Sequence, residues 1–132
     1  MIVLDASVLA NLVGDDGPAG EQARRRVVAE PYVAIPDLAD VESVAVFRRR
    51  WLRGDIGARR FRHAVDDLRA LPFPRFPSGP LLGRAYELRA NVTAYDACYV
   101  GLAEALGATL LTADARLGAA PGVACRVGVL TD

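Results

Sequence analysis

Four carboxylates occupy positions from which they could act together on one substrate. Asp5 directly follows the apolar run MIVL, and Asp114 follows the run TLLT by one residue. Glu42 and Asp96 lie in DLADVESVAVF and TAYDACYVGL, which have the patterning of helices. Four acids around one pocket repel one another, which raises the pKa of at least one of them unless divalent cations neutralise the charge. Because oxygen-only ligand sets favour Mg²⁺ or Mn²⁺, the sequence predicts a site for one of these ions.

Each acid also has a structural explanation. The two acids after the apolar runs are suited to capping a helix or starting a turn. Asp96 is the third residue after Thr93, which is close to the spacing of a capping box. It also shares a helix face with Tyr99, Val100 and Ala103, and we expect this face to turn toward the sheet. The structural and chemical interpretations of Asp96 are compatible.

Glu42 is expected on or beside an apolar stripe. If Asp37 caps this helix, one face carries residues at the i, i+3, i+4 and i+7 spacing, namely Leu38, Val41, Glu42 and Ala45. A carboxylate in such a place is costly unless it is paired or binds a metal. The alternative is a flanking position, from which the side chain reaches water or pairs with Arg49.

The elements that must position these acids alternate along the chain. Short apolar runs predict strands over 1–4, 32–35, 109–112 and 123–130. Helices are expected over about 8–13, with Ser7 as a cap, and over about 18–30, 37–53, 58–70, 81–90 and 93–107. The four prolines of 71–80 indicate a connector or an edge segment. This order predicts a three-layer α/β/α fold with a mostly parallel sheet, in which ligands bind beyond the carboxyl ends of the strands.

Composition limits the classes of function. The 132 residues suit one domain over 1–132, and 16 basic side chains balance 16 acidic ones. All basic residues are arginines, which excludes P-loop and Schiff-base chemistry that needs lysine. Cys98 and Cys125 are expected as buried free thiols, and His63, the one histidine, as a surface residue, so a zinc site is disfavoured. No apolar run is long enough for a membrane span, and a cytoplasmic protein is expected, mature as written.

The segments that carry the acids resemble the PIN-domain family, and within it the VapC-type toxins of bacterial toxin–antitoxin pairs. The resemblance runs through MIVLDASVL, DLADVESVAVFRRR, TAYDACYVGLAEALGATLLTAD and the closing ARL. It places the family's acidic cluster on Asp5, Glu42, Asp96 and Asp114, with Asp5 and Asp96 as the main metal ligands. It also places small hydroxyl residues at Ser7 and Thr112, where they would hold the carboxylates by hydrogen bonds.

The resemblance implies a Mg²⁺- or Mn²⁺-dependent endoribonuclease. A metal-activated water would attack the phosphodiester in line and leave 5′-phosphate and 3′-hydroxyl ends. It further implies neutralisation by a VapB-type antitoxin and assembly as a homodimer. Two alternatives remain open at this point, a PIN-like binding module without turnover and a DNA-directed nuclease relative.

An arginine-rich segment, FRRRWLRGDIGARRFR over 47–62, allows three interpretations. Its seven arginines could form a basic rim that holds RNA phosphates. They could instead be the solvated side of a helical pair whose aromatic residues belong to the core. The resemblance adds a third role, a clamp for the antitoxin, and the spacing of Phe47 and Trp51 suits either a core or such a groove.

Overall fold

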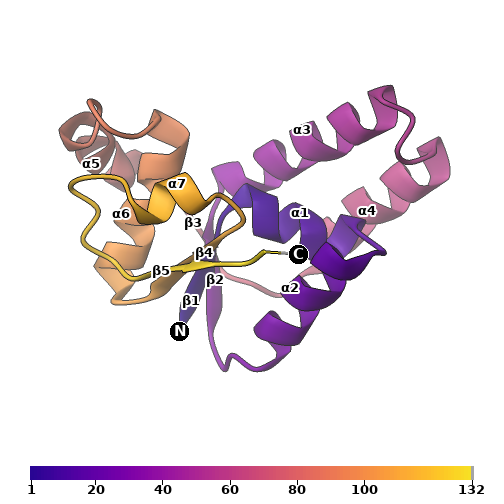
Figure 1. The fold of residues 1–132 in the computed structure, drawn as a ribbon, viewed down its shortest axis with the longest axis horizontal. Coiled ribbons are helices and arrows are strands. Elements are labelled where there is room, and N and C mark those ends of the chain that lie inside the picture. The colour runs from indigo at the N-terminus through magenta and orange to yellow at the C-terminus, as the bar shows by residue number, and fades with distance from the viewer. Residues whose placement is uncertain (132) are drawn as a thin grey trace.

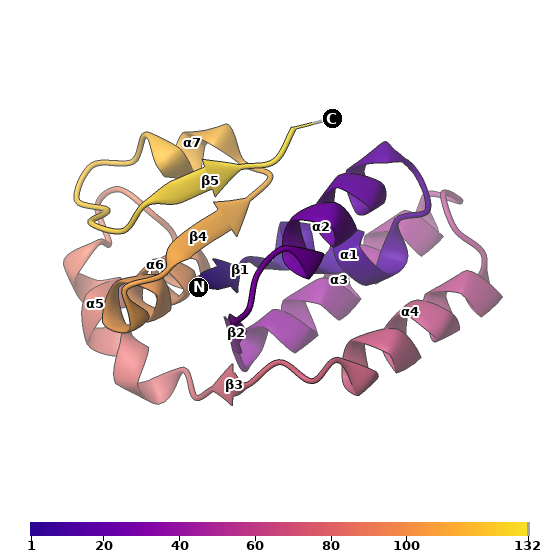
Figure 2. The ribbon, with the colours of Figure 1, turned by 90° about the horizontal axis from the view of Figure 1, so that it is seen from below.

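The computed structural model describes residues 1–131, and at its centre lies a sheet of five parallel strands in the order β3-β2-β1-β4-β5. The strands are β1 (Ile2–Leu4), β2 (Val33–Pro36), β3 (Arg75–Phe76), β4 (Thr109–Thr112) and β5 (Val127–Val129). Figure 2 shows them following one another across the molecule in this order. The proline-rich segment supplies the short edge strand β3, and the last strand is shorter than the predicted 123–130.

Helices cover both faces of the sheet. On one side lie α1 (Ala6–Gly14), α2 (Pro18–Val28), α3 (Leu38–Leu52) and α4 (Ala58–Ala70). On the other side lie α5 (Leu82–Glu87) and α6 (Ala94–Leu106), as Figure 1 shows. A turn of 3₁₀ helix (Gly79–Leu81) leads into α5, and α7 (Ala115–Gly118) packs beside β5. The predicted three-layer α/β/α fold with a parallel sheet is confirmed.

The strand order defines a point at which the chain reverses its direction across the sheet. From β1 the chain moves outward to β2 and β3, and it then returns past β1 to β4 and β5. Because crossovers between parallel strands are right-handed, the two directions place their helices on opposite faces. The boundary between β1 and β4 is therefore a topological switch point, and ligands bind beyond the carboxyl ends of strands at such points.

The core is built around β1. Its residues Ile2, Val3 and Leu4 are at most 1% exposed, because α1 and α6 pack on the strand from the two faces. Burial on both faces explains why this strand is continuously apolar. Gly107 ends α6 with a φ of 64°, a left-handed conformation that favours glycine.

Two local predictions are wrong. Helix α1 begins at Ala6, and its N-cap is Asp5 in place of Ser7, because Asp5 follows the strand in an extended conformation and its carboxylate accepts from Val8 N–H. Asp37 precedes α3 but makes no capping bond, and its carboxylate accepts from the Ser78 hydroxyl instead.

The buried face of α3 also differs from the predicted stripe. It consists of Ala39, Ser43 and Phe47, whereas Val41 is 74% exposed and Ala45 is exposed. Helix α3 packs mainly on α1 and α4. These helices bury Ala39 and Ser43, each of which is one residue after a position of the predicted stripe. Within residues 1–131, no helix combines the length and the apolar character that crossing a membrane requires.

Candidate active site

The four predicted carboxylates line one pocket of about 200 Å³, which we call the acid pocket. Asp5 follows β1 and Asp114 follows β4, so these two lie at the carboxyl ends of the strands that flank the switch point. Glu42 comes from α3 on one face of the sheet, and Asp96 from the first turn of α6 on the other. The fold thus brings together side chains from both helical layers.

Asp5 is the most buried of the four, with 6% of its surface exposed. Its Oδ1 accepts from the Ser7 hydroxyl at 2.5 Å and from Val8 N–H at 3.1 Å, and its own N–H donates to Leu111 O at 3.1 Å. Burial raises the pKa of Asp5, and the hydroxyls of Ser7 and Thr112 oppose this rise. Asp5 is therefore held rigidly, and its negative charge is poorly compensated by the protein.

Glu42 is half-buried at the edge of α3 and accepts a hydrogen bond at 2.7 Å from the hydroxyl of Tyr99. Tyr99 lies on α6 and is 1% exposed, so the bond joins the two helical layers across the pocket. Burial raises the pKa of Glu42, and the charges of Asp96 and Asp5 raise it further. The structure shows Tyr99 as the bonded partner of Glu42, where the sequence suggested Arg49.

Asp96 stands in the first turn of α6, where its N–H donates to the Thr93 hydroxyl at 3.1 Å. The predicted Thr93 cap is confirmed. Burial raises the pKa of the half-buried Asp96 carboxyl, and the charge of Asp114 raises it as well. Asp96 therefore serves the helix with its backbone and faces the pocket with its carboxylate, which agrees with the compatibility expected of the two interpretations.

Asp114 differs from the other three because a cation holds it. Its carboxylate accepts from Arg116 Nε and Nη2, both at 3.1 Å, and from Arg116 N–H at 2.9 Å. This pair lowers the pKa of Asp114. The Asp114 N–H donates to the Thr112 hydroxyl at 3.0 Å, which fixes the turn after β4. The Arg116 side chain is 92% exposed, so the ion pair can open at little cost.

The arginine-rich segment contributes one side chain to this pocket, that of Arg49. Arg49 follows Glu42 by seven residues on α3 and is exposed. Other arginines of the segment bond elsewhere: Arg50 donates to Asn11 Oδ1 at 2.6 Å, and Arg60 and Arg62 pair with acids. These serve the structural role that the sequence left open. Arg49 is thus the one arginine of this segment that lines the acid pocket.

The acid pocket does not present a ready-made metal cage. Among residues 1–131, no three histidine, cysteine, aspartate or glutamate side chains converge closely enough to hold an ion. The donor chemistry still suits a hard cation, since all four side chains are carboxylates and three of them have raised pKa values. Asp114 differs in that Arg116 already neutralises its charge.

Tyr99 and Arg116 are the site residues to which the sequence assigned no role. Tyr99 was placed only as a neighbour of Asp96 on α6. Tyr99 follows Asp96 by three residues, so it lies one turn further along the same face of α6. This spacing could have marked Tyr99 as a residue of the site. Arg116 gave no signal apart from its closeness in the chain to Asp114.

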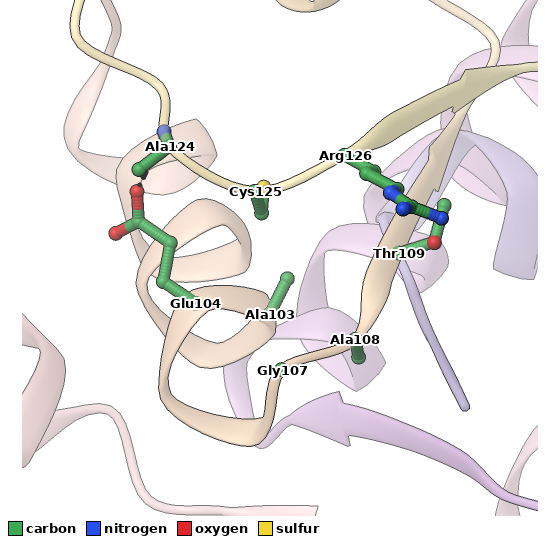
Figure 3. Close-up of a pocket in the computed structure, with 8 residues that line it drawn as sticks. All are labelled: Ala103, Glu104, Gly107, Ala108, Thr109, Ala124, Cys125 and Arg126. Carbon is green, nitrogen blue, oxygen red and sulfur yellow. Dashed lines mark hydrogen bonds between the residues drawn. The ribbon is translucent and has the colours of Figure 1, made fainter.

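A larger pocket, of about 540 Å³, lies at the opposite end of β4 (Figure 3). Its single acid, Glu104, already accepts from Arg84 at 2.7 Å and from Ala124 N–H at 2.8 Å. Cys125 lies in its wall as a half-buried free thiol, while Cys98 is free and fully buried. His63 is exposed, as predicted. This second pocket lacks the charge of the first.

Known proteins share this fold and much of this sequence. The PIN domain family matches residues 2–123. Ribonuclease VapC9 of Mycobacterium tuberculosis is 39% identical over 130 residues, which covers 98% of each chain.

Two solved structures share the fold. The crystal structure of Mycobacterium tuberculosis VapC20, described as a Sarcin-Ricin loop cleaving toxin, has a TM-score of 0.71 at 20% identity and covers 90% of this chain and 94% of that one. FitAcB from Neisseria gonorrhoeae has a TM-score of 0.72 at 15% identity, with 96% of each chain covered. On the family match and the identity to VapC9, this chain belongs to the PIN domain family.

Proposed function

We propose that this chain is an endoribonuclease of the VapC type, the toxin of a toxin–antitoxin pair. The observation that carries the proposal is the convergence of Asp5, Glu42, Asp96 and Asp114 on one pocket at the switch point of the sheet. The curated relatives that share 39% of the sequence over nearly the whole chain are ribonucleases by name. The cytoplasm, where RNA is found, is the compartment that we propose for this activity.

Divalent metal dependence is the second part of the proposal. Asp5 and Asp96 are the main candidates to hold Mg²⁺ or Mn²⁺, with Glu42 and Asp114 as further ligands or as groups that orient the attacking water. When bound, such a cation supplies charge stabilisation at the phosphoryl oxygens and activates water for in-line attack. The raised pKa values of three of these carboxyls support the proposal, because they reflect negative charge that the protein itself leaves uncompensated.

The chain's own side chains divide the remaining work. Ser7 fixes the orientation of Asp5, and Tyr99 fixes that of Glu42, so both act as positioning residues. Arg49 lies at the pocket as a cation without a bonded acid among the described residues, and we assign it to the phosphate of the RNA. A guanidinium suits this task because its planar donors match two phosphate oxygens at once.

A VapB-type antitoxin is the partner that we propose. Its candidate surface is the far end of α3 and α4, where Trp51 is 44% exposed and packs against Phe61 with ring centroids 6.2 Å apart. A pocket of about 360 Å³ beside them is lined by apolar and charged side chains of α4, namely Ala58, Phe61, Arg62, Val65, Asp66 and Arg69, and Arg62 pairs with Asp66. An amphipathic segment with an acid placed to meet Arg69 would suit it. Phe47 is fully buried, so it belongs to the core.

We also propose that the protein assembles as a homodimer. This part of the proposal is supported only by the resemblance to the VapC-type toxins.

The function is tested by incubating the purified protein with single-stranded RNA and, in parallel, with flap DNA. We expect RNA cleavage with Mg²⁺ or Mn²⁺, products with 5′-phosphate ends, and no cleavage with EDTA. Asp96→Asn should abolish cleavage because it removes a carboxylate. It should leave the melting temperature unchanged, because the backbone N–H of residue 96 still donates to the Thr93 hydroxyl. Arg48→Gln is the control, since Arg48 is exposed and does not line the pocket. Cleavage of DNA alone would favour a DNA-directed nuclease. If neither RNA nor DNA were cleaved with any metal, a binding module without turnover would be favoured.

A further inference from the structure

A further pocket, of about 270 Å³ and distinct from the one in Figure 3, adjoins the acid pocket. Asp96 and Asp114 line both it and the acid pocket. Its far walls come from the segment that precedes α6 and from α7 with the residues after it. They are Asn91, Val92, Thr93, Arg116, Leu117 and Ala120. We call this hollow the Asn91 pocket. Any molecule whose phosphate lies among the four carboxylates has its neighbouring group within reach of this pocket.

The lining of the Asn91 pocket is apolar in depth and polar at the rim. Leu117 is 4% exposed and belongs to the core, while Val92 and Ala120 are half-buried beside it. Asn91 and Arg116 are exposed at the rim. Such a surface suits a flat ring that is apolar on its faces and carries hydrogen-bonding groups along its edge. A nucleobase has this character.

Both polar groups of the rim make hydrogen bonds in this structure. The Asn91 amide donates to the Pro121 carbonyl at 3.2 Å, which fixes its orientation. Arg116 is held against Asp114 through two guanidinium contacts at 3.1 Å. Because the Arg116 side chain is 92% exposed, its pair with Asp114 could open if Asp114 held a cation, and Arg116 would then be free at the rim for a base edge or the adjoining sugar-phosphate.

From this arrangement we infer that the Asn91 pocket binds one nucleoside of the RNA, the neighbour of the scissile phosphate, and that Asn91 selects its base. The inference rests on the proposed ribonuclease function. We assign a base and not a phosphate to this pocket, because the side chains of its floor, Leu117, Val92 and Ala120, are apolar and offer a phosphate no hydrogen bond. A base can lay its apolar face on the same side chains.

Two variants test the pocket without touching the four carboxylates. Asn91→Ala removes the amide from the rim. Ala120→Phe fills the floor with a ring. The matched control is Ala119→Phe, since Ala119 is exposed, adjoins Ala120 and does not line the pocket. The melting temperature of each variant is measured first, and we expect all three to fold.

The first measurement is the cleavage of a randomised RNA pool with Mg²⁺, followed by sequencing of the new 5′ ends. The wild-type protein and Ala119→Phe should show a base preference at one nucleotide adjoining the cut. Asn91→Ala should weaken that preference about tenfold and leave other positions unchanged, the size expected for loss of a base-edge contact. Ala120→Phe should slow cleavage at least tenfold. Cleavage with unaltered rates and preferences in both variants would overturn the inference.

The second measurement does not depend on turnover. The four nucleoside 5′-monophosphates are added to the ¹⁵N-labelled protein with Mg²⁺, and backbone amide shifts are followed by NMR. We expect the largest shifts at Val92 and Ala120, reduced in Ala120→Phe but not in Ala119→Phe. If the pool is not cleaved but these shifts appear, the proposed ribonuclease function fails and the nucleoside pocket stands. If the pool is cleaved and these amides do not shift, the pocket assignment fails and the function stands.

Discussion

Replacing Tyr99 by phenylalanine should destabilise the protein through one hydrogen bond. The variant removes only the hydroxyl that donates to Glu42 Oε1 at 2.7 Å, and the ring still fills its place in the core. A hydrogen bond to a charged group contributes about 1.5–3 kcal/mol. We take the lower end, about 1.5 kcal/mol, because Glu42 is only half-buried and water can replace part of the bond.

The assay is thermal and urea unfolding of the metal-free protein at pH 7. For a domain of this length, about 1.5 kcal/mol corresponds to a fall of about 5 °C in the melting temperature. Tyr86→Phe is the control, because Tyr86 is 66% exposed, and it should change the unfolding free energy by less than about 0.5 kcal/mol.

A double-mutant cycle isolates the bond from other effects of the variant. In a Glu42→Gln background the acceptor is neutral, so Tyr99→Phe should cost only about 0.5–1 kcal/mol. A Tyr99→Phe protein within about 0.3 kcal/mol of wild type, or an equal cost in both backgrounds, would refute the assignment of Tyr99 as the group that holds the Glu42 carboxylate.

Three further outcomes follow from the same geometry. Asp5→Asn should raise the melting temperature of the metal-free protein while abolishing cleavage, because it removes a buried charge yet keeps a good helix cap. Addition of Mg²⁺ at ten times its Kd should stabilise the wild type by about 1.4 kcal/mol, and a calorimetric scan of Asp5→Asn should show a much smaller effect. Arg84 lowers the pKa of Glu104, so this pair stabilises the fold above the ordinary carboxyl pKa and loses that contribution as the pH falls through the lowered pKa. Glu104→Gln should therefore cost about 1–2 kcal/mol in urea unfolding at pH 7, and much less at a pH below the lowered pKa.

The sequence predicted best where local signals and packing agree. Asp5 and Asp114 could be placed because each follows a short apolar run, and the carboxyl ends of parallel strands share one edge of a sheet. The cap at Thr93 and the stop at Gly107 depend on nearby residues only, and both are confirmed.

The errors occur where distant contacts decide the outcome. The face of α3 was wrong because Val41 resembles a core residue in a local pattern, yet the positions of α1 and α4 bury Ala39 and Ser43 instead. Tyr99 and Glu42 are 57 residues apart in the chain, so no local pattern relates the hydroxyl to the carboxylate. Asp5 and not Ser7 is the N-cap of α1, because β1 ends at Leu4 and Asp5 is still in an extended conformation where the helix begins.

The switch point has a consequence for the newly made protein. The acid pocket is lined by Asp5, near the start of the chain, and by Asp114, which follows β4. Strand β4 pairs directly with β1, which precedes Asp5. A chain that is still growing on the ribosome, or one that ends before β4, lacks both the strand and the last carboxylate. The proposed nuclease site is therefore completed only after β4 and Asp114 have been made and have joined β1, so a shorter nascent chain carries no assembled acid pocket.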